Sequence, residues 1–258
     1  MRRTVGVVAL VLVLAACGNQ PGTTNAGPAP TPTTATTPPA PPSSPTPTRS
    51  PLKIPTGPNL SGCYTEEDGK IFSYGDDLPG VVMGKGEVGA VITYERGGRA
   101  CTWRPLADRL VAGGYRVLLY ARDLDAVPAD NVVAMARRLD KERGVKRLFL
   151  IGGSIGGIAS VDAAPRLEGM VAGVVNLAGA PNPADSAKLR VPLLQVTGEN
   201  DGRIPAAIQQ AHDAATGSPD RRTIVVPGES AHASFLFDTP HGQEVLDGIM
   251  AFVDRHKG

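Results

Sequence analysis

The chain has 258 residues, of which 41% are hydrophobic and 20% charged, and its formal net charge at pH 7 is +1. This near-neutral balance gives no reason to expect nucleic acid or an acidic substrate as a partner. More than half of the 24 prolines fall in residues 18–58, interleaved with Thr, Ser and Ala. Such a segment cannot bury a core, and the sequence predicts a disordered tether over residues 17–58. The folded part is expected over residues 59–258, which is enough for one α/β domain.

The N-terminus has the layout of an export signal. Arg2 and Arg3 form a basic start, and the apolar run at residues 5–14 is too short to span a bilayer as a helix. This run leads into the sequence LAAC at residues 14–17, which resembles the lipobox of bacterial lipoproteins. The resemblance implies removal of residues 1–16, a diacylglycerol group on the Cys17 thiol, and anchoring at the extracytoplasmic face of the cell membrane. The alternative is an ordinary secretory peptide that happens to carry a cysteine.

Two cysteines remain in the predicted domain, Cys63 and Cys101. An even pair in an exported domain forms a disulfide more often than it stays as two free thiols. The sequence therefore predicts a Cys63–Cys101 bridge. No Cys/His spacing in the chain is typical of a metal site, so no metal is expected.

Short apolar runs alternate with segments of helical spacing along the domain. Strands are expected at residues 88–94, 115–120, 145–151, 171–177, 191–197 and 222–226. Helices are expected at residues 103–112, 128–143, 155–164 and 240–256. Residues 69–83 are expected to add an antiparallel hairpin at the edge. This alternation predicts an α/β fold with a mostly parallel twisted sheet and helices on both faces, and its functional residues should follow the carboxyl ends of the strands.

The sequence GGSIGG at residues 152–157 follows a predicted strand and opens a predicted helix. A phosphate-binding P-loop would need lysine after its last glycine, where Ile158 stands, and a dinucleotide-binding turn would need glycine in place of Ser154. The segment fits the pattern G-x-S-x-G, in which small neighbours allow a sharp strand-to-helix turn that exposes a serine. Ser154 is therefore the candidate nucleophile.

Two more polar residues follow predicted strands. Asp201 lies in GENDGRIP and His232 in PGESAHASF. An aspartate in a glycine-rich loop is usually a turn residue, and a loop histidine is usually solvated, so neither is specific alone. The other histidines fit less well, because they lie within or next to helices or at the C-terminus: His212, His241 and His256.

The chain order Ser154, Asp201, His232 is that of the α/β-hydrolase catalytic triad. The chain resembles this superfamily over residues 60–258. The family pattern G-x-x-D-x-x-[VI]-P corresponds to the segment from Gly198 to Pro205, and P-G-x-x-H corresponds, with one additional residue, to the segment from Pro227 to His232. The resemblance implies that Ser154 is the nucleophile, that His232 is the base and then the acid, and that Asp201 fixes the imidazole tautomer. It implies no cofactor.

One departure concerns the oxyanion hole. Ile155 N–H is the expected first donor, and Arg96 N–H the expected second. Relatives usually carry His-Gly at the end of the preceding strand, where this chain has Tyr94-Glu95. A carboxylate there would oppose an oxyanion unless Glu95 turns away or pairs with Arg96 or Arg99.

The segment GAPNPADSAKLR at residues 179–190 is too short for a helical cap, and aromatic residues make up only 4% of the chain. An open site for small or surface-presented esters is expected. The proportions are similar to those of small esterases and dienelactone-hydrolase-like proteins, although the latter carry a cysteine nucleophile. The sequence thus predicts a monomeric, lipid-anchored, extracytoplasmic carboxylesterase. The alternatives are a peptidase or thioesterase with the same triad, or a non-catalytic envelope binding protein.

Overall fold

The computed structural model describes residues 57–258. The predicted signal peptide, Cys17 and nearly all of the predicted tether lie outside the described residues. No helix within the described range is long and apolar enough to cross a membrane.

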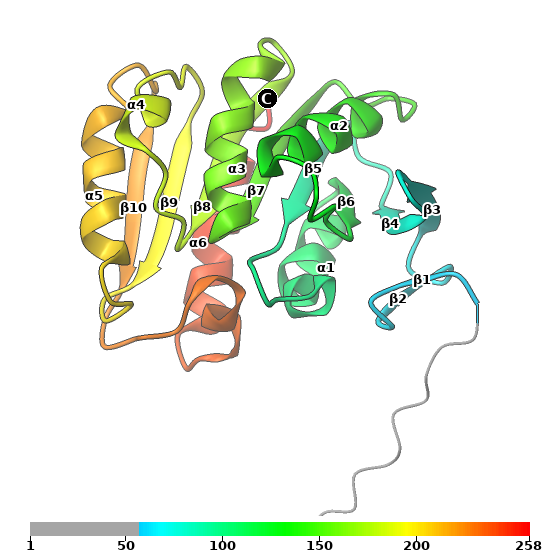
Figure 1. Cartoon of the computed structure of the whole chain (residues 1–258), viewed down its shortest axis with the longest axis horizontal. Coiled ribbons are helices and arrows are strands. Elements are labelled where there is room, and N and C mark those ends of the chain that lie inside the picture. Colours follow the sequence, from blue (N-terminus) through cyan, green and yellow to red (C-terminus); the bar gives the residue numbers. More distant parts are fainter. Residues whose placement is uncertain (1–56) are drawn as a thin grey trace, which may run out of the picture. The chain divides into compact units, whose positions relative to one another are not determined.

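An eight-stranded sheet forms the centre of the domain (Figure 1). Its strands are β3 (Lys70–Tyr74), β4 (Leu78–Met83), β5 (Val88–Thr93), β6 (Arg116–Tyr120), β7 (Arg147–Gly153), β8 (Val171–Leu177), β9 (Leu193–Gly198) and β10 (Arg221–Val226). They lie in the order β10-β9-β8-β7-β5-β6-β4-β3. The pairings from β10 to β6 are parallel, and β4 and β3 continue the sheet as an antiparallel hairpin. The predicted mostly parallel sheet is confirmed.

Helices cover both faces of this sheet. They are α1 (Arg104–Ala112), α2 (Pro128–Asp140), α3 (Ile155–Ala163), α4 (Pro183–Ser186), α5 (Ile204–Ala214) and α6 (Gly242–Arg255), with 3₁₀ turns η1 (Ala100–Trp103), η2 (Ala164–Leu167) and η3 (Ala233–Asp238). Successive strand residues pack on opposite faces, so Ile92 lies in the core beneath α1 and α6, and Val91 in the core beneath α2 and α3. The side-chain amide of Gln195 bonds to the Ile208 carbonyl, which puts α5 on the α3 face.

Helix boundaries differ from the predicted ones by a few residues. The predicted start of the last helix at residue 240 is two residues early, because η3 ends at Asp238 and the intervening residues form a turn. In that turn the Thr239 hydroxyl accepts a hydrogen bond from the His241 N–H at 3.3 Å. Thr239 therefore stabilises the connection between η3 and α6.

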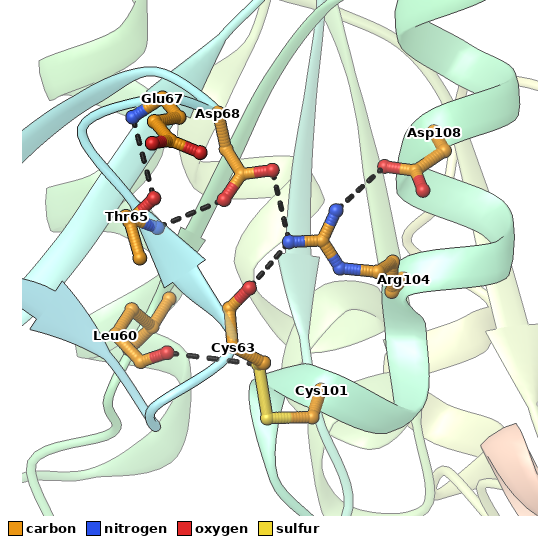
Figure 2. A network of polar contacts seen from close by, with 8 residues as sticks. All are labelled: Leu60, Cys63, Thr65, Glu67, Asp68, Cys101, Arg104 and Asp108. Carbon is orange, nitrogen blue, oxygen red and sulfur yellow. Dashed lines mark hydrogen bonds and ion pairs between the residues drawn. A yellow bond between two sulfur atoms is a disulfide. The ribbon is translucent and has the colours of Figure 1, made fainter. Parts of the chain in front are cut away.

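A small hairpin precedes the large sheet and is tied to η1 (Figure 2). Its strands are β1 (Asn59–Leu60) and β2 (Tyr64–Thr65). Cys63, in the turn between them, forms a disulfide with Cys101 of η1, with Cα atoms 5.7 Å apart. The Arg104 guanidinium donates to the Cys63 carbonyl and, at 2.9 Å, to Asp68 Oδ1. The disulfide thus ties η1 to the hairpin, and Arg104 holds the start of α1 to the hairpin turn and to Asp68, just after β2.

The strand register sets where the loops emerge. Thr93 at the end of β5 pairs with Gly152, Gly153 pairs with Leu177, and Gly198 at the end of β9 pairs with Val226. Strands β5, β7, β8, β9 and β10 therefore end at one edge of the sheet. The segments that carry the predicted site residues all leave from this edge, as expected for an open parallel sheet.

Candidate active site

Ser154 lies in a sharp turn between β7 and α3. Its backbone has φ 51° and ψ −118°, which is rare and strained for a residue with a side chain. The turn is possible because glycines flank it: a Cβ on Gly156 would lie 2.1 Å from the Thr93 carbonyl oxygen, and one on Gly152 would lie 2.3 Å from the Gly156 carbonyl. The local sequence thus dictates a strand–serine–helix elbow, the geometry expected from G-x-S-x-G.

His232 and Asp201 meet at the same sheet edge. Asp201 follows β9 and His232 follows β10, and His232 Nδ1 lies 2.7 Å from Asp201 Oδ2. The His232 and Asp201 side chains are 36% and 14% exposed, so the pair is partly accessible to solvent. With Nδ1–H donated to the carboxylate, Nε2 is left as an acceptor, the tautomer that a general base requires.

The serine elbow and the histidine segment pack against each other. A Cβ on Gly153 would lie 2.8 Å from the Cβ of Ala233, so the residue before Ser154 contacts the residue after His232. Within residues 57–258 no hydrogen bond joins Ser154 Oγ to His232 Nε2. Such bonds are often long in ligand-free sites and tighten when substrate binds.

The two expected oxyanion donors line one cavity of about 360 Å³, together with Arg122, Asp123, Leu124, Ala126 and Pro128. Ile155 is the first residue of α3, and the first N–H groups of a helix have no partner within it. Arg96 lies in the exposed loop after β5. A larger cavity of about 470 Å³ lies at the opposite edge of the sheet, beside Arg147 and Val171, and no predicted site residue lines it.

Glu95 turns away from this cavity. Its side chain is buried, and its carboxylate accepts hydrogen bonds from Trp103 Nε1 at 2.9 Å and from Ser234 Oγ at 2.5 Å. The Arg122 guanidinium donates to the Glu95 backbone carbonyl at 3.3 Å. Of the two possibilities raised by the sequence, Glu95 turns inward, and its carboxylate pairs with neither Arg96 nor Arg99 within the described part of the chain.

Tyr120, near the end of its strand, is buried and hydrogen-bonded and does not offer a charged group to the site. The Tyr120 hydroxyl shares a hydrogen bond of 2.9 Å with Thr93 Oγ1, and burial raises the pKa of Tyr120 far above its usual value. The phenol therefore stays neutral. Across residues 57–258 no group of three or more His, Cys, Asp or Glu side chains could hold a metal ion.

Sequence patterns did not identify Trp103, Thr102 and Ser234 as residues near the site. Ser234 is separated from Glu95 by 139 positions, so no local pattern links them. The one available signal was position, because Ser234 follows the candidate histidine by two residues.

The profile of the alpha/beta hydrolase family matches residues 90–243. Solved structures with a similar fold include a dienelactone hydrolase from Anabaena variabilis ATCC 29413, with a TM-score of 0.62 and 18% identity over 73% of this chain and 99% of that one. An esterase from Pyrococcus furiosus has a TM-score of 0.62 and 14% identity over 78% and 97% of the two chains. A monoacylglycerol lipase from Paleococcus ferrophilus has a TM-score of 0.60 and 14% identity over 69% and 99%.

At these identities the structural similarity establishes the fold and leaves the substrate open. No curated protein sequence matches the chain significantly. The family profile spans more than half of the chain, and the sheet order and helix placement agree with it. The chain therefore belongs to the alpha/beta hydrolase family.

Proposed function

We propose that the protein is a carboxylesterase that uses Ser154 as its nucleophile. The observation that carries this proposal is the 2.7 Å contact between His232 Nδ1 and Asp201 Oδ2, next to the strained Ser154 turn. Membership of the hydrolase family supports it, as does the presence of esterases among proteins of the same fold.

In the proposed reaction, His232 Nε2 takes the proton of Ser154 Oγ as the oxygen attacks the ester carbonyl carbon. The Ile155 and Arg96 N–H groups stabilise the resulting oxyanion. When the intermediate collapses, the bond to the alcohol oxygen breaks and His232 returns the proton to that oxygen. Water then repeats the sequence on the acyl-enzyme, which releases the acid and restores Ser154. Asp201 stabilises the imidazolium in both halves.

The experiment that tests this proposal is labelling with a fluorophosphonate probe, which loses fluoride as its phosphorus bonds to an activated serine. We expect one label, located at Ser154 by peptide mass spectrometry. A panel of esters, thioesters and peptides then separates the carboxylesterase from a thioesterase or peptidase with the same triad. Folded protein that neither labels nor hydrolyses any of these would favour a non-catalytic binding protein.

The expected substrate preference follows from the short connection between β8 and β9. Only α4 lies in this connection, and the cavity beside the oxyanion donors is at the small end of the range for ligand pockets. A long acyl chain would therefore remain in water and gain little free energy from burial. We expect kcat/KM for butyryl esters to exceed that for dodecanoyl esters by about tenfold or more.

The measurement is a chain-length series from acetyl to dodecanoyl esters, kept below the concentration at which the long esters form micelles. A matched series with one acyl group and varied alcohols controls for leaving-group effects. A maximum at dodecanoyl, or activation on adding an oil–water interface, would contradict an open, uncapped site.

We also propose that the mature protein is anchored at the outer face of the cell membrane through Cys17. The LAAC sequence supports this, and a disulfide in the domain fits an oxidising compartment. A diacylglycerol group carries two acyl chains, which suffice for stable anchoring. In a bacterial host we expect the protein in the membrane fraction with a lipidated Cys17 as its first residue, and Cys17→Ser should prevent this processing. An N-terminal peptide that begins elsewhere, or carries an unmodified cysteine, would refute the anchor.

A further inference from the structure

A buried polar cluster lies directly behind the candidate site and consists of Glu95, Thr102, Trp103 and Ser234. Glu95 is 1% exposed, and its carboxylate accepts hydrogen bonds from Trp103 Nε1 on Oε2 and from Ser234 Oγ on Oε1. The Ser234 hydroxyl also lies 2.8 Å from Thr102 Oγ1. No lysine or arginine forms an ion pair with this carboxylate within residues 57–258. A buried carboxylate without a cation is costly, so these donors are what make the arrangement stable.

The Glu95 cluster joins three segments that are far apart in the sequence. Glu95 follows the end of β5, Thr102 and Trp103 belong to η1, and Ser234 belongs to η3. Segment η1 is itself held by the Cys63–Cys101 disulfide (Figure 2). One end of the cluster is therefore covalently tied to the β1–β2 hairpin, and the other end is two residues from His232.

The segment between His232 and Ser234 is strained. Ala233 has φ 53°, a left-handed conformation that a residue with a Cβ rarely adopts. Such a conformation persists only where the surroundings impose it. The Glu95–Ser234 hydrogen bond lies on one side of Ala233 and the His232–Asp201 bond on the other. Both hydrogen bonds therefore act on the short segment that carries His232, and the serine elbow packs on Ala233 in the same segment.

We propose that Glu95 is a positioning residue for His232 and acts through Ser234. It contacts neither the substrate nor the reacting atoms. It holds the start of η3 at a fixed distance from β5 and η1, and so holds the imidazole in line with Ser154. This role rests on the proposed function, because it matters only if His232 transfers protons. Glu95, which replaces the glycine usual in the family, would then help to position His232 without contacting the substrate.

Catalytic groups must be held within about 0.5 Å of their working positions, and a displacement of about 1 Å can cost on the order of 100-fold in rate. Glu95→Ala removes both acceptors, and we expect kcat to fall by roughly 100-fold. KM should change little, since no contact with the substrate is lost. Ser234→Ala removes the contacts with Glu95 and Thr102 but leaves the Glu95–Trp103 hydrogen bond, and should lower kcat by roughly tenfold.

Glu95→Gln separates positioning from charge. The glutamine carbonyl can accept from Trp103 Nε1 while its amide donates to the Ser234 oxygen, so the connection between η1 and η3 is preserved. We therefore expect Glu95→Gln to keep most of the wild-type kcat. If it is as inactive as Glu95→Ala, the charge of Glu95 matters rather than its hydrogen bonds, and the positioning role is refuted.

The control is Ser218→Ala, which removes another largely buried serine hydrogen bond, from Ser218 Oγ to the Val191 carbonyl at 2.7 Å, near the start of β9. It should lower the thermal midpoint in a way comparable to Ser234→Ala and leave kcat unchanged. A loss of kcat in Ser218→Ala equal to that in Ser234→Ala would mean that general destabilisation explains both.

A second readout follows His232 itself. Its Nδ1–H, hydrogen-bonded to Asp201, should give a strongly downfield proton NMR signal that shifts or broadens in Glu95→Ala and Ser234→Ala. An unchanged signal, or a wild-type kcat, in Ser234→Ala would overturn the proposal, even if Glu95→Ala does not fold. If wild-type protein neither labels nor hydrolyses esters, the proposed function fails, whereas this signal still decides whether Glu95 and Ser234 position His232.

Discussion

Replacing Ser154 by alanine is expected to abolish fluorophosphonate labelling and to lower ester kcat by about 10⁵- to 10⁶-fold. The reason is that, in the proposed reaction, the first bond to the substrate forms at the Ser154 oxygen. The turn itself should survive, because alanine has the same Cβ as serine and demands no new space beside Gly152 and Gly156. Circular dichroism and thermal unfolding should match those of the wild type.

The partners of Ser154 provide the internal control. Members of a triad act as one unit, so His232→Ala and the double variant Ser154→Ala/His232→Ala should lose about as much activity as Ser154→Ala alone. Asp201→Asn should lose less, roughly 10⁴-fold, because the serine and the imidazole remain. Losses that multiply in the double variant would show that the two residues act independently, which contradicts a triad.

Removing the disulfide should have the largest effect on stability. Cys63 and Cys101 are 38 positions apart, and in the chain-entropy model a bridge of this span contributes about 4 kcal/mol. The double variant Cys63→Ser/Cys101→Ser should therefore unfold roughly 10 °C below the oxidised wild type. Dithiothreitol should lower the wild-type midpoint toward that of the variant and leave the variant unaffected.

The contacts of Arg104 near the Cys63–Cys101 disulfide indicate where this loss of stability should come from. Arg104 already links the same hairpin to α1 through Asp68 and the Cys63 carbonyl, so the native geometry should persist without the bridge (Figure 2). The loss should then come from a looser unfolded chain rather than from a damaged fold. Equal midpoints for the oxidised wild type and the double variant would show that the bridge adds no stability.

Much of the fold could be predicted because both sheet faces are buried. Runs such as Val88–Thr93 and Arg147–Gly153 place apolar residues on both sides, and glycine or proline marks most of their ends. Most of the elements that were not predicted are short; the exception is the 11-residue helix α5, for which no bounds were predicted. Two-residue strands at Asn59–Leu60 and Tyr64–Thr65, and the single turn Pro183–Ser186, are too brief to show a period.

The candidate site also has a part that the sequence predicts and a part that it does not. Ser154 stands out by its glycine spacing, and Asp201 and His232 by their places after strands, because these signals are local. The orientation of Glu95 depends on Trp103 and Ser234, which approach it only once β5, η1 and η3 are packed together. Hydrogen bonds between distant segments leave no periodic trace in the sequence, so only the folded chain reveals them.

The tight packing of the elbow has a consequence for laboratory evolution of this protein. Side chains added at Gly152 or Gly156 would overlap backbone atoms, so libraries that vary the elbow would consist mainly of misfolded chains. Three exposed apolar residues, which we call the rim, are different. Leu124 and Val127, in the loop before α2, and Phe235, in η3, are 78%, 59% and 48% exposed. Surface positions usually accept substitution at little cost in stability. New substrate preferences should therefore be sought by diversifying the rim while the elbow is kept fixed.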